Sequence, residues 1–198
     1  MTDEWISLLK QGDPTAFEEL VRQLTPAVYK IAYSMMGNEH DAQDAAQDTF
    51  IKVFKALPHF RGDSQLSTWV YRIAVNTCKD TLRALGRYQT VSPDDEDVFL
   101  QIPDGAPTPE DTAITKEQQA AVRAAVEKLP TEYKLVISLC DLNGLSYVEA
   151  AQALSCPLGT VKSRLNRARM LLLKRLSKKR ELFADEERHI SSKEEPKR

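Results

Sequence analysis

The sequence predicts an all-α protein of two small helical domains joined by a flexible acidic linker, with a helix-turn-helix as the C-terminal domain. Three observations support this prediction. Apolar residues recur at intervals of three and four in both halves of the chain, and no stretch alternates with the period of two that is typical of strands. A proline-rich acidic segment separates the halves. We expect domains at 1–87 and 116–180, a linker at 88–115 and a disordered tail at 181–198.

The N-terminal domain begins with two predicted helices on either side of a proline. Asp13 is placed to cap the first helix, and Pro14 suits its first turn. The apolar residues of this helix repeat at i, i+3, i+4 and i+7 and are Phe17, Leu20, Val21 and Leu24. The second helix is expected over residues 26–36, and Gly37 ends it in the left-handed conformation.

Two further helices complete this domain. Asn38 is placed to cap the third helix, whose inward residues are expected to be Ala42, Ala46, Thr49, Phe50, Val53 and Leu57. Its opposite face carries Asp41, Asp44 and Asp48. A fourth helix is expected over residues 64–85, with an apolar stripe made by Leu66, Trp69, Val70, Ile73, Ala74 and Thr77.

The linker is identified by its composition. Residues 92–111 contain four prolines and seven acidic residues but no lysine or arginine. Such a segment buries too little apolar surface to fold by itself. We therefore expect residues 88–115 to form an extended, flexible connection.

Helices are predicted again after the linker. The first covers residues 117–129, and Thr131 is placed to cap a second over residues 132–140. Ser146 and Glu149 form the S-x-x-E pattern of a capping box at the start of a third helix.

The last two predicted helices are joined by a sharp turn, as in a helix-turn-helix. Pro157 presets the first turn of the last helix, and Gly159 keeps the approach uncrowded. This helix is expected to stay regular to about Leu176, after which the chain frays. Its inward stripe consists of Val161, Leu165, Ala168, Leu172 and Leu176. The N-terminal half of such a helix is the part that enters the major groove of DNA.

The outward side chains of this helix suit DNA. Arginine and lysine donate to guanine, asparagine binds adenine, and serine or threonine meets phosphates or base edges. The expected DNA contacts are Thr160, Lys162, Ser163, Arg164, Asn166 and Arg167. Among the cations, Arg164 and Arg169 flank the outward face and are expected to hold phosphates. The alternative is a solvated basic helix, but the capping box, the tight turn and the acid-free stretch 160–180 favour DNA binding.

A second candidate site for nucleic acid lies in the N-terminal domain. It combines four residues on one face of the fourth helix with three from the preceding loop. These residues are Arg72, Asn76, Lys79, Arg83, Phe60, Arg61 and Ser64. An aromatic ring can stack on an unpaired base while cations follow the phosphates, so the pattern indicates a site for unpaired nucleotides. Tyr71 is a second candidate platform, whereas Trp69 is expected in the core.

Composition and motifs argue against other classes of protein. The net charge of −2 and the acidic linker predict weak DNA binding by the free chain, because affinity scales with the phosphates neutralised. No apolar run approaches the roughly 18 residues of a membrane span, so we expect a cytoplasmic protein. The histidines and cysteines lack metal-site and redox spacing, and common enzyme motifs are missing. We predict no metal, no cofactor, no small-molecule substrate and no enzymatic activity.

Three segments, in fixed order, resemble the extracytoplasmic-function (ECF) sigma factors of bacteria. They are DAQDAAQDTFIKVFKAL, FRGDSQLSTWVYRIAVNTCKDTLR and GTVKSRLNRAR. The resemblance covers about residues 13–176. It implies a non-catalytic subunit that binds core RNA polymerase, recognises promoter DNA and helps to melt it. It also implies an anti-sigma factor as a partner, which in this family often holds the protein at the membrane.

The resemblance also assigns roles to positions. It implies that Phe60 and Asn76 hold a base flipped from the non-template strand of the minus-ten element, in a pocket shaped by the loop of residues 61–65. Together with the residues singled out above, the expected minus-ten contacts are Phe60, Arg61, Ser64, Tyr71, Arg72, Asn76, Lys79 and Arg83. The resemblance matches Asp44, Gln47 and Asp48 to the polymerase-binding face, and we add Asp41 from the same acidic face. It matches Lys162, Ser163, Arg164, Asn166 and Arg167 to the reader of the minus-thirty-five element, and we add Thr160.

Two other functions stay open from the residues alone. One is a free-standing helix-turn-helix regulator that binds duplex DNA as a dimer, which would need neither the pair Phe60 and Asn76 nor the acidic face. The other is an anti-regulator or scaffold whose helices bind only protein.

Overall fold

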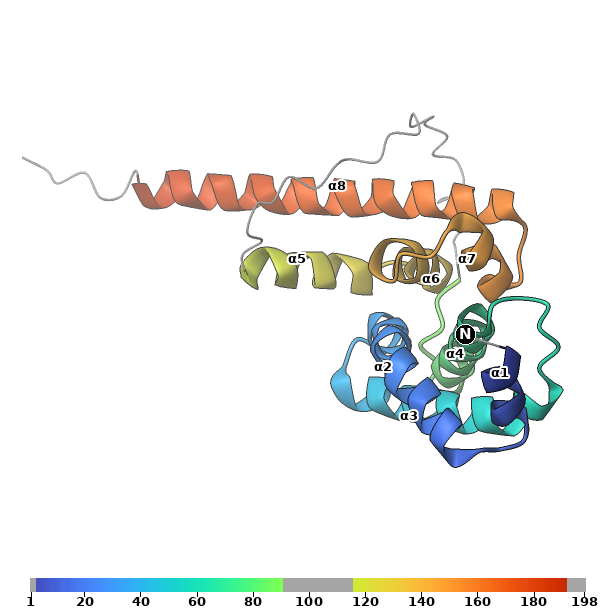
Figure 1. The fold of residues 1–198 in the computed structure, drawn as a ribbon. Helices are drawn as coiled ribbons and strands as arrows, with labels where there is room; N and C mark the ends of the chain where they lie inside the picture. Colours follow the sequence, from blue (N-terminus) through green and yellow to red (C-terminus); the bar gives the residue numbers. More distant parts are fainter. Residues whose placement is uncertain (1–2, 91–115, 192–198) are drawn as a thin grey trace, which may run out of the picture.

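The computed structural model describes residues 3–90 and 116–191, and every regular element in these two stretches is a helix (Figure 1). The N-terminal half consists of α1 (Asp3–Lys10), α2 (Pro14–Met36), α3 (Glu39–Ala56), the short 3₁₀ helix η1 (Leu57–His59) and α4 (Leu66–Ala84). The C-terminal half consists of α5 (Lys116–Glu127), α6 (Thr131–Ile137), the π-helical turn η3 (Ser138–Leu142), α7 (Tyr147–Leu154) and α8 (Leu158–Ser191). The predicted all-α class with two helical parts is confirmed. Most of the predicted linker, residues 91–115, and the tail residues 192–198 lie outside the described residues.

Helices α2, α3 and α4 pack against one another and enclose the core of the N-terminal half. Leu20 and Val53, both predicted to face inward, have no exposed surface. The predicted ends of the helices are also found here. Asn38 caps α3 by accepting a hydrogen bond of 2.9 Å from the backbone N–H of Asp41, and Gly37 ends α2 with a φ of 78°.

The predicted break at Pro26 is wrong, because α2 passes through this proline as one helix. A proline inside a helix removes a backbone hydrogen bond and typically costs about 3 kcal/mol. However, Leu24 and Val28 on the two sides of it are 6% and 0% exposed and pack into the same core. Full burial of such a side chain contributes about 1.5 to 3 kcal/mol, so the packing of the two segments outweighs the local penalty.

Two helical segments differ from the expected boundaries. Helix α1 was not predicted, yet it buries Leu9 and packs on α2 and η1. At the other end, α8 continues to Ser191, past Leu176, where regular helix was expected to end. The reason lies in the sequence, since no glycine or proline follows Gly159 until Pro196. Loss of apolar periodicity alone therefore does not end this helix.

In the C-terminal half, α6, α7 and α8 pack around Tyr133, Leu135 and Leu165, each at most 1% exposed. The predicted capping role of Thr131 is wrong. Helix α6 begins at Thr131, whose hydroxyl accepts a hydrogen bond of 3.0 Å from the backbone N–H of Gln89. The N–H of Thr131 donates in turn to the carbonyl of Gln89. The Thr131 side chain thus hydrogen-bonds to a residue 42 positions away in the sequence, and local spacing cannot predict such a contact.

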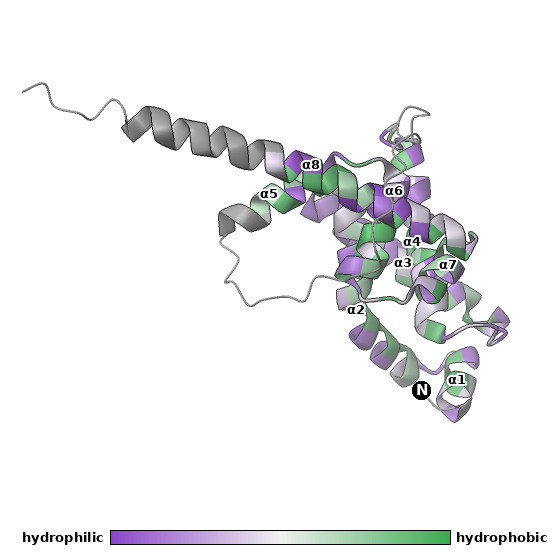
Figure 2. Cartoon of the chain, turned by 90° about the horizontal axis from the view of Figure 1, so that it is seen from above, coloured by the Kyte–Doolittle hydropathy of each residue, from purple (hydrophilic) through white to green (hydrophobic). Residues whose placement is uncertain are grey.

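The two halves are in contact. Helix α7 packs along α4, and α5 and α6 pack on α2 (Figure 1). Seen from above, α5 and α8 run side by side over the N-terminal half (Figure 2). The buried core runs without interruption from one half into the other. One cation from each of the two sites predicted for nucleic acid, Lys79 of α4 and Arg164 of α8, pairs with the same carboxylate of Glu132. Among the helices of the described residues, none has both the length and the apolar composition needed to span a bilayer.

Candidate nucleic-acid interfaces

The turn that precedes α8 is built by a capping box and a left-handed residue. At the start of α7, the Ser146 hydroxyl accepts from the N–H of Glu149 at 3.3 Å, and the Glu149 carboxylate accepts from the N–H of Ser146 at 2.9 Å. This capping box was predicted and is confirmed. At the other end of α7, Ser155 takes a positive φ of 52°. The tight reversal thus rests on Ser155, whereas Gly159 sits in open space without a left-handed conformation.

The N-terminal part of α8 has a buried side and a solvent-facing side. Val161 and Leu165 of the inward stripe are buried. The outward side, which we call the recognition face, consists of the exposed Lys162, Ser163 and Asn166 and the half-buried Arg167. Thr160 is half-buried at the first turn of the helix. Two cations and two hydrogen-bonding side chains therefore share one face at the start of a helix, as direct reading of base edges requires.

The two flanking arginines of α8 are bound to carboxylates of the chain. Arg164 donates to Glu132 at 2.7 Å, and Arg169 donates to Asp141 at 2.5 and 3.1 Å. The Asp141 hydrogen bond raises the pKa of Arg169 further above its ordinary value. Both arginines lie where the sequence predicted phosphate contacts, but each already has an anionic partner within the protein.

The loop before α4 lines a cavity of about 530 Å³. Its wall includes Phe60, Arg61 and Ser64, as well as Arg72 from α4. Phe60 is only 4% exposed and packs against Trp69, with the ring centroids 5.1 Å apart. Phe60 thus forms the floor of the cavity rather than a free platform, and Trp69 is in the core as predicted.

The cavity differs from the predicted site in two respects. Asn76 lies exposed on α4 and is not part of the cavity wall, so the structure does not bring it together with Phe60 there. In addition, Gln152 of α7 and Ser155 of the following turn form part of the wall. The C-terminal half thus borders a site that the sequence assigned to the N-terminal half alone.

The remaining cations of α4 are unequal in exposure. Arg83 is exposed, pairs with Asp80 and lies 4.9 Å from the centre of the Tyr88 ring. Lys79 is only 16% exposed and pairs with Glu132 at 3.3 Å. Tyr71 is half-buried, and burial together with the negative charge of Glu149 raises the pKa of its hydroxyl. The predicted basic face of α4 is therefore partly covered by the C-terminal half.

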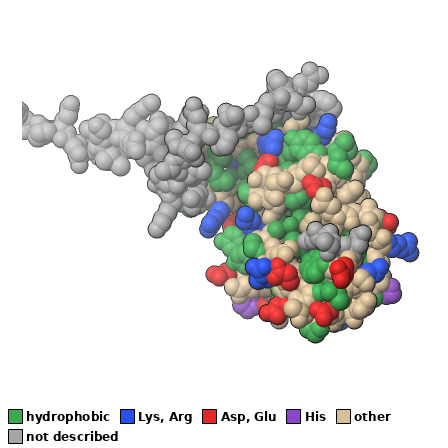
Figure 3. All heavy atoms as spheres, viewed as in Figure 1, with side chains coloured by type: hydrophobic (Ala, Val, Ile, Leu, Met, Phe, Trp, Pro, Cys, Tyr) green, Lys and Arg blue, Asp and Glu red, His purple; other side chains and the backbone are tan. Residues whose placement is uncertain are grey.

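The predicted acidic face of α3 is open to solvent except at its N-terminal end. Asp44, Gln47 and Asp48 are exposed. Asp41 instead accepts from the amide of Asn38 and from the guanidinium of Arg87, and these two hydrogen bonds lower the pKa of its carboxyl. Figure 3 shows acidic, basic and apolar side chains interspersed over the N-terminal half. Three of the four predicted residues are thus free to meet a partner.

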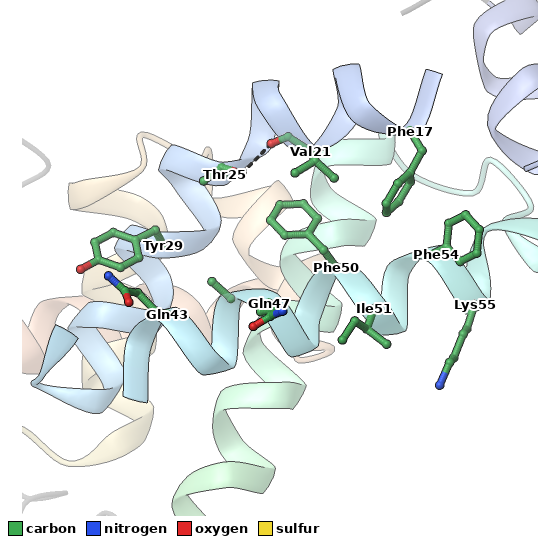
Figure 4. Close-up of a pocket in the computed structure, with 11 residues that line it drawn as sticks. Phe17, Val21, Thr25, Tyr29, Gln43, Gln47, Phe50, Ile51, Phe54 and Lys55 are labelled. Carbon is green, nitrogen blue, oxygen red and sulfur yellow. Dashed lines mark hydrogen bonds between the residues drawn. The ribbon is translucent and has the colours of Figure 1, made fainter. Parts of the chain in front are cut away.

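An apolar groove of about 660 Å³ lies between α2 and α3, and the sequence interpretation missed it (Figure 4). Its wall includes Phe17 and Val21 of α2 and Phe50, Ile51 and Phe54 of α3. Ile51 and Phe54 are 46% and 50% exposed, although the rings of Phe54 and Phe17 pack edge to face with their centroids 4.9 Å apart. The available signal was that these two large apolar residues fall outside the inward stripe of α3.

The groove and the acidic face share a border. Gln47 belongs to the predicted polymerase-binding residues and also lines the groove (Figure 4). The face of α3 next to it carries the exposed Asp44 and Asp48. An apolar strip beside exposed carboxylates is suited to a protein partner that presents apolar and basic side chains, because exposed apolar patches of this kind mark interaction sites.

Comparison with known proteins relates both halves to one family. The family model for sigma-70 region 2 matches residues 20–88, and the model for sigma-70 region 4 matches residues 119–172. The ECF RNA polymerase sigma factor SigE of Mycolicibacterium smegmatis is 38% identical over 84% of this chain, which spans 65% of that relative's length. The ECF RNA polymerase sigma factor SigW of Bacillus subtilis is 33% identical over 89% of this chain and 97% of its own.

A solved structure shares the arrangement of helices. It is the complex of the sigma factor RpoE with the anti-sigma factor NepR from Bartonella quintana. The match has a TM-score of 0.62 and 28% identity, and it covers 81% of this chain and 96% of the other.

Proposed function

This chain belongs to the ECF RNA polymerase sigma factors, and we propose that its two helical halves share promoter recognition between them. The chain is a sigma factor that directs core RNA polymerase to promoters and is not itself an enzyme. The region 2 half, residues 1–87, binds polymerase and the minus-ten element, and the region 4 half, residues 116–180, binds the minus-thirty-five element. The observation that carries this function is the match of both region models, in this order, on one chain.

The minus-thirty-five element is read by the recognition face of α8. Lys162, Ser163 and Asn166 are exposed and Arg167 is half-buried at the N-terminal part of the helix. This position supports insertion into the major groove, where such side chains distinguish base pairs. Thr160 and Arg164 border the face and contact phosphates, Arg164 after it has left Glu132.

The minus-ten element is held by the cavity before α4 and by the cations of that helix. Arg61 and Arg72 are exposed at the cavity wall, and Phe60 lies at its floor. This combination supports binding of an unstacked base, with the cations following the strand. The other contributors are Ser64, Tyr71, Asn76, Lys79 and Arg83.

Core polymerase docks on the acidic face of α3 and in the apolar groove beside it. Asp44 and Asp48 attract basic residues of the polymerase, while Ile51 and Phe54 supply apolar contact. Gln47 links the two surfaces, and Asp41 contributes from the edge of the face.

An anti-sigma factor is the second protein partner in this proposal. A structural relative was solved as a complex with such a protein, and the family resemblance implies one here as well. The chain then acts in the cytoplasm, and the anti-sigma factor holds it at the membrane until a signal releases it.

Transcription in vitro tests this function directly. The purified chain is mixed with bacterial core polymerase and with promoters mapped from the transcripts that rise when the chain is overproduced. We expect defined start sites only when both proteins are present. A chain that binds a palindromic duplex tightly without polymerase, and starts no transcript with it, would instead be the free-standing dimeric regulator.

Reversing two charges tests the docking face. We expect Asp44→Lys combined with Asp48→Lys to weaken capture of core polymerase on the immobilised chain by at least about tenfold, because both carboxylates are exposed. Glu18→Lys on α2 is the matched control, since it reverses an exposed carboxylate outside this face. Equal capture by the double variant and the control would remove the assignment.

A further inference from the structure

The contact between the two halves has a carboxylate at its centre. Glu132, at the first turn of α6, is 14% exposed. It accepts from Lys79 of α4 at 3.3 Å, from Arg164 of α8 at 2.7 Å and from the Tyr88 hydroxyl at 2.5 Å. We call these four residues the Glu132 cluster. One side chain thus ties together the last helix of region 2, the start of the linker and the recognition helix of region 4.

The electrostatics of this cluster favour a charged glutamate. Burial alone would raise the pKa of Glu132, but the Tyr88 hydrogen bond and the charges of Lys79 and Arg164 outweigh it and leave the pKa below its ordinary value. Burial, together with the same hydrogen bond to Glu132, raises the pKa of Tyr88 to about 12. The cluster is therefore held as one anion between two cations at neutral pH. Lys79 and Arg164 are only 16% and 28% exposed, so water competes with these contacts less than at an open surface.

Both cations of the cluster are ones that the proposed function assigns to DNA. Lys79 belongs to the minus-ten contacts and Arg164 to the minus-thirty-five contacts. A carboxylate that accepts from both takes the place that a phosphate would occupy. In addition, Gln152 and Ser155 of the helix-turn-helix border the cavity that holds Phe60. The contact between the halves thus covers parts of both DNA sites.

We call the arrangement in which the two halves touch the closed arrangement. In it, the two proposed DNA sites are too near each other to bind both promoter elements at once. The two elements are named for positions about 25 base pairs apart, which is roughly 85 Å along straight B-form DNA at about 3.4 Å per base pair. In the structure, the turn of the helix-turn-helix lines the same cavity as the minus-ten loop. The halves must therefore separate before both elements can be bound. The stretch 91–115 is long enough for this, since it could span at most about 80 to 90 Å when fully extended.

We propose that Glu132 is an autoinhibitory latch that imitates a DNA phosphate, holding the free chain closed by occupying Lys79 and Arg164 until polymerase separates the two halves. This inference rests on the proposed function, because it assumes that both cations contact promoter DNA. It adds a local cause to the weak DNA binding that the net charge of −2 predicts for the free chain. Opening exchanges one carboxylate for phosphates on two separate DNA segments.

The test compares the full chain with Glu132→Gln, which keeps a hydrogen-bond acceptor for Tyr88 but removes the charge. Small-angle X-ray scattering gives the radius of gyration, and fluorescence anisotropy gives the affinity for a labelled duplex with the minus-thirty-five sequence mapped from the transcripts. We expect the variant to have a larger radius of gyration and to bind the duplex about tenfold more tightly, because breaking a partly buried ion cluster leaves two cations without a counter-charge.

Asp141→Asn is the matched control. It removes the partner of Arg169, another arginine at the edge of the recognition face, but both residues lie within the C-terminal half. We expect the radius of gyration to stay that of the wild type. If both variants tightened DNA binding equally and neither expanded the chain, the gain would be a simple charge effect and the latch would be refuted.

A second variant guards against misfolding of the first. Lys79→Gln removes the cation that the N-terminal half contributes to the cluster, and it should also expand the chain in scattering. Unchanged compactness in both Glu132→Gln and Lys79→Gln, with wild-type DNA affinity in Glu132→Gln, overturns the latch even if the wild type directs transcription. Expansion without any transcription in the presence of core polymerase overturns the proposed function instead and leaves the closed contact established.

Discussion

The two surfaces that we propose for DNA binding in this sigma factor are constructed in different ways. The recognition face belongs to one helix, and its residues follow from the period of α8, with Val161 and Leu165 inside and Lys162 and Asn166 outside. The cavity proposed for the minus-ten element is assembled from η1, the following loop and α4, and Gln152 of α7 and Ser155 of the following turn complete its wall. A site on one helix depends on local geometry, whereas a composite site depends on how whole elements pack.

The two sites also differ in how far their side chains are exposed when the two halves are in contact. On the recognition face, Lys162, Ser163 and Asn166 are exposed and Arg167 is half-buried, while Arg164 at its edge is paired with Glu132. On α4, by contrast, Lys79 is paired with the other half and Tyr71 is half-buried. If the proposed roles hold, the readers of region 4 are accessible in the free chain, whereas the full site of region 2 becomes accessible only after the halves have separated.

The largest effect that bears on this comparison is expected from the core beneath the recognition face. Leu165→Ala removes a side chain that is 1% exposed, and we expect it to lower the free energy of unfolding by about 2 to 5 kcal/mol. Leu173→Ala is the control, since that residue of the same helix is 64% exposed. Urea unfolding followed by circular dichroism measures both. Similar losses in the two variants would mean that the inward stripe does not hold the face in place.

The second effect concerns reading by that face. We expect Arg167→Ala to weaken binding of holoenzyme to its minus-thirty-five duplex by about 1 to 3 kcal/mol, because a base-edge contact of arginine is of this size. Competition with duplexes altered one base pair at a time measures the loss for each sequence. The weakening should be greatest on the cognate sequence. An equal loss on every duplex would show that Arg167 only contacts phosphate.

Periodicity and capping rules predicted most of the fold. They placed the cap at Asn38, the end of α2 at Gly37, the capping box of Ser146 and the buried Trp69. They failed where a distant contact overrides local chemistry. Pro26 remains inside a helix because both sides of it are buried in one core, and Thr131 bonds to Gln89 rather than to its own helix.

The candidate sites, too, were predicted correctly where local spacing determines them and missed where a distant contact does. The outward residues of α8 could be read from spacing, because one helix presents them. The partners of Arg164 and Lys79 could not, since Glu132 lies 32 residues from Arg164 and on a different helix from both. The apolar groove was missed for a similar reason. From the sequence, Phe17 and Phe50 are expected to be ordinary inward residues. Only the packing of α2 on α3 shows that they line an open groove.

A smaller effect is expected at the composite site. We expect Arg61→Ala and Asn76→Ala each to weaken binding of holoenzyme to a single-stranded minus-ten oligonucleotide by about 0.5 to 1.5 kcal/mol, the net worth of a typical hydrogen bond. Both residues are exposed, so the fold should persist, whereas Phe60→Ala would also disturb the packing against Trp69. Fluorescence anisotropy measures the affinity.

Lys10→Ala on α1 is the control for these two variants, because it removes an exposed cation far along the chain from the site. We also expect the effect of Arg61→Ala to be weaker in the isolated chain than in holoenzyme, since α7 borders the cavity that Arg61 lines. An equal effect in both would mean that the cavity is as accessible in the isolated chain as in holoenzyme.

The smallest effect is expected at the capping box that orients the helix-turn-helix, and it depends on pH. Hydrogen bonds from the hydroxyl and the backbone N–H of Ser146 lower the pKa of Glu149 below its ordinary value of 4.5. The charged carboxylate therefore adds stability above the unfolded-state pKa, and this contribution disappears as the pH falls through the lower folded-state value. Because the group is largely solvated, we expect Glu149→Gln to cost less than about 1 kcal/mol at pH 7 and progressively less as the pH falls below 4.5. Urea midpoints over this pH range measure this, with Glu18→Gln as the control at an exposed position outside a cap. A difference between wild type and Glu149→Gln that is independent of pH would mean that the geometry of the side chain, and not its charge, supports the start of α7.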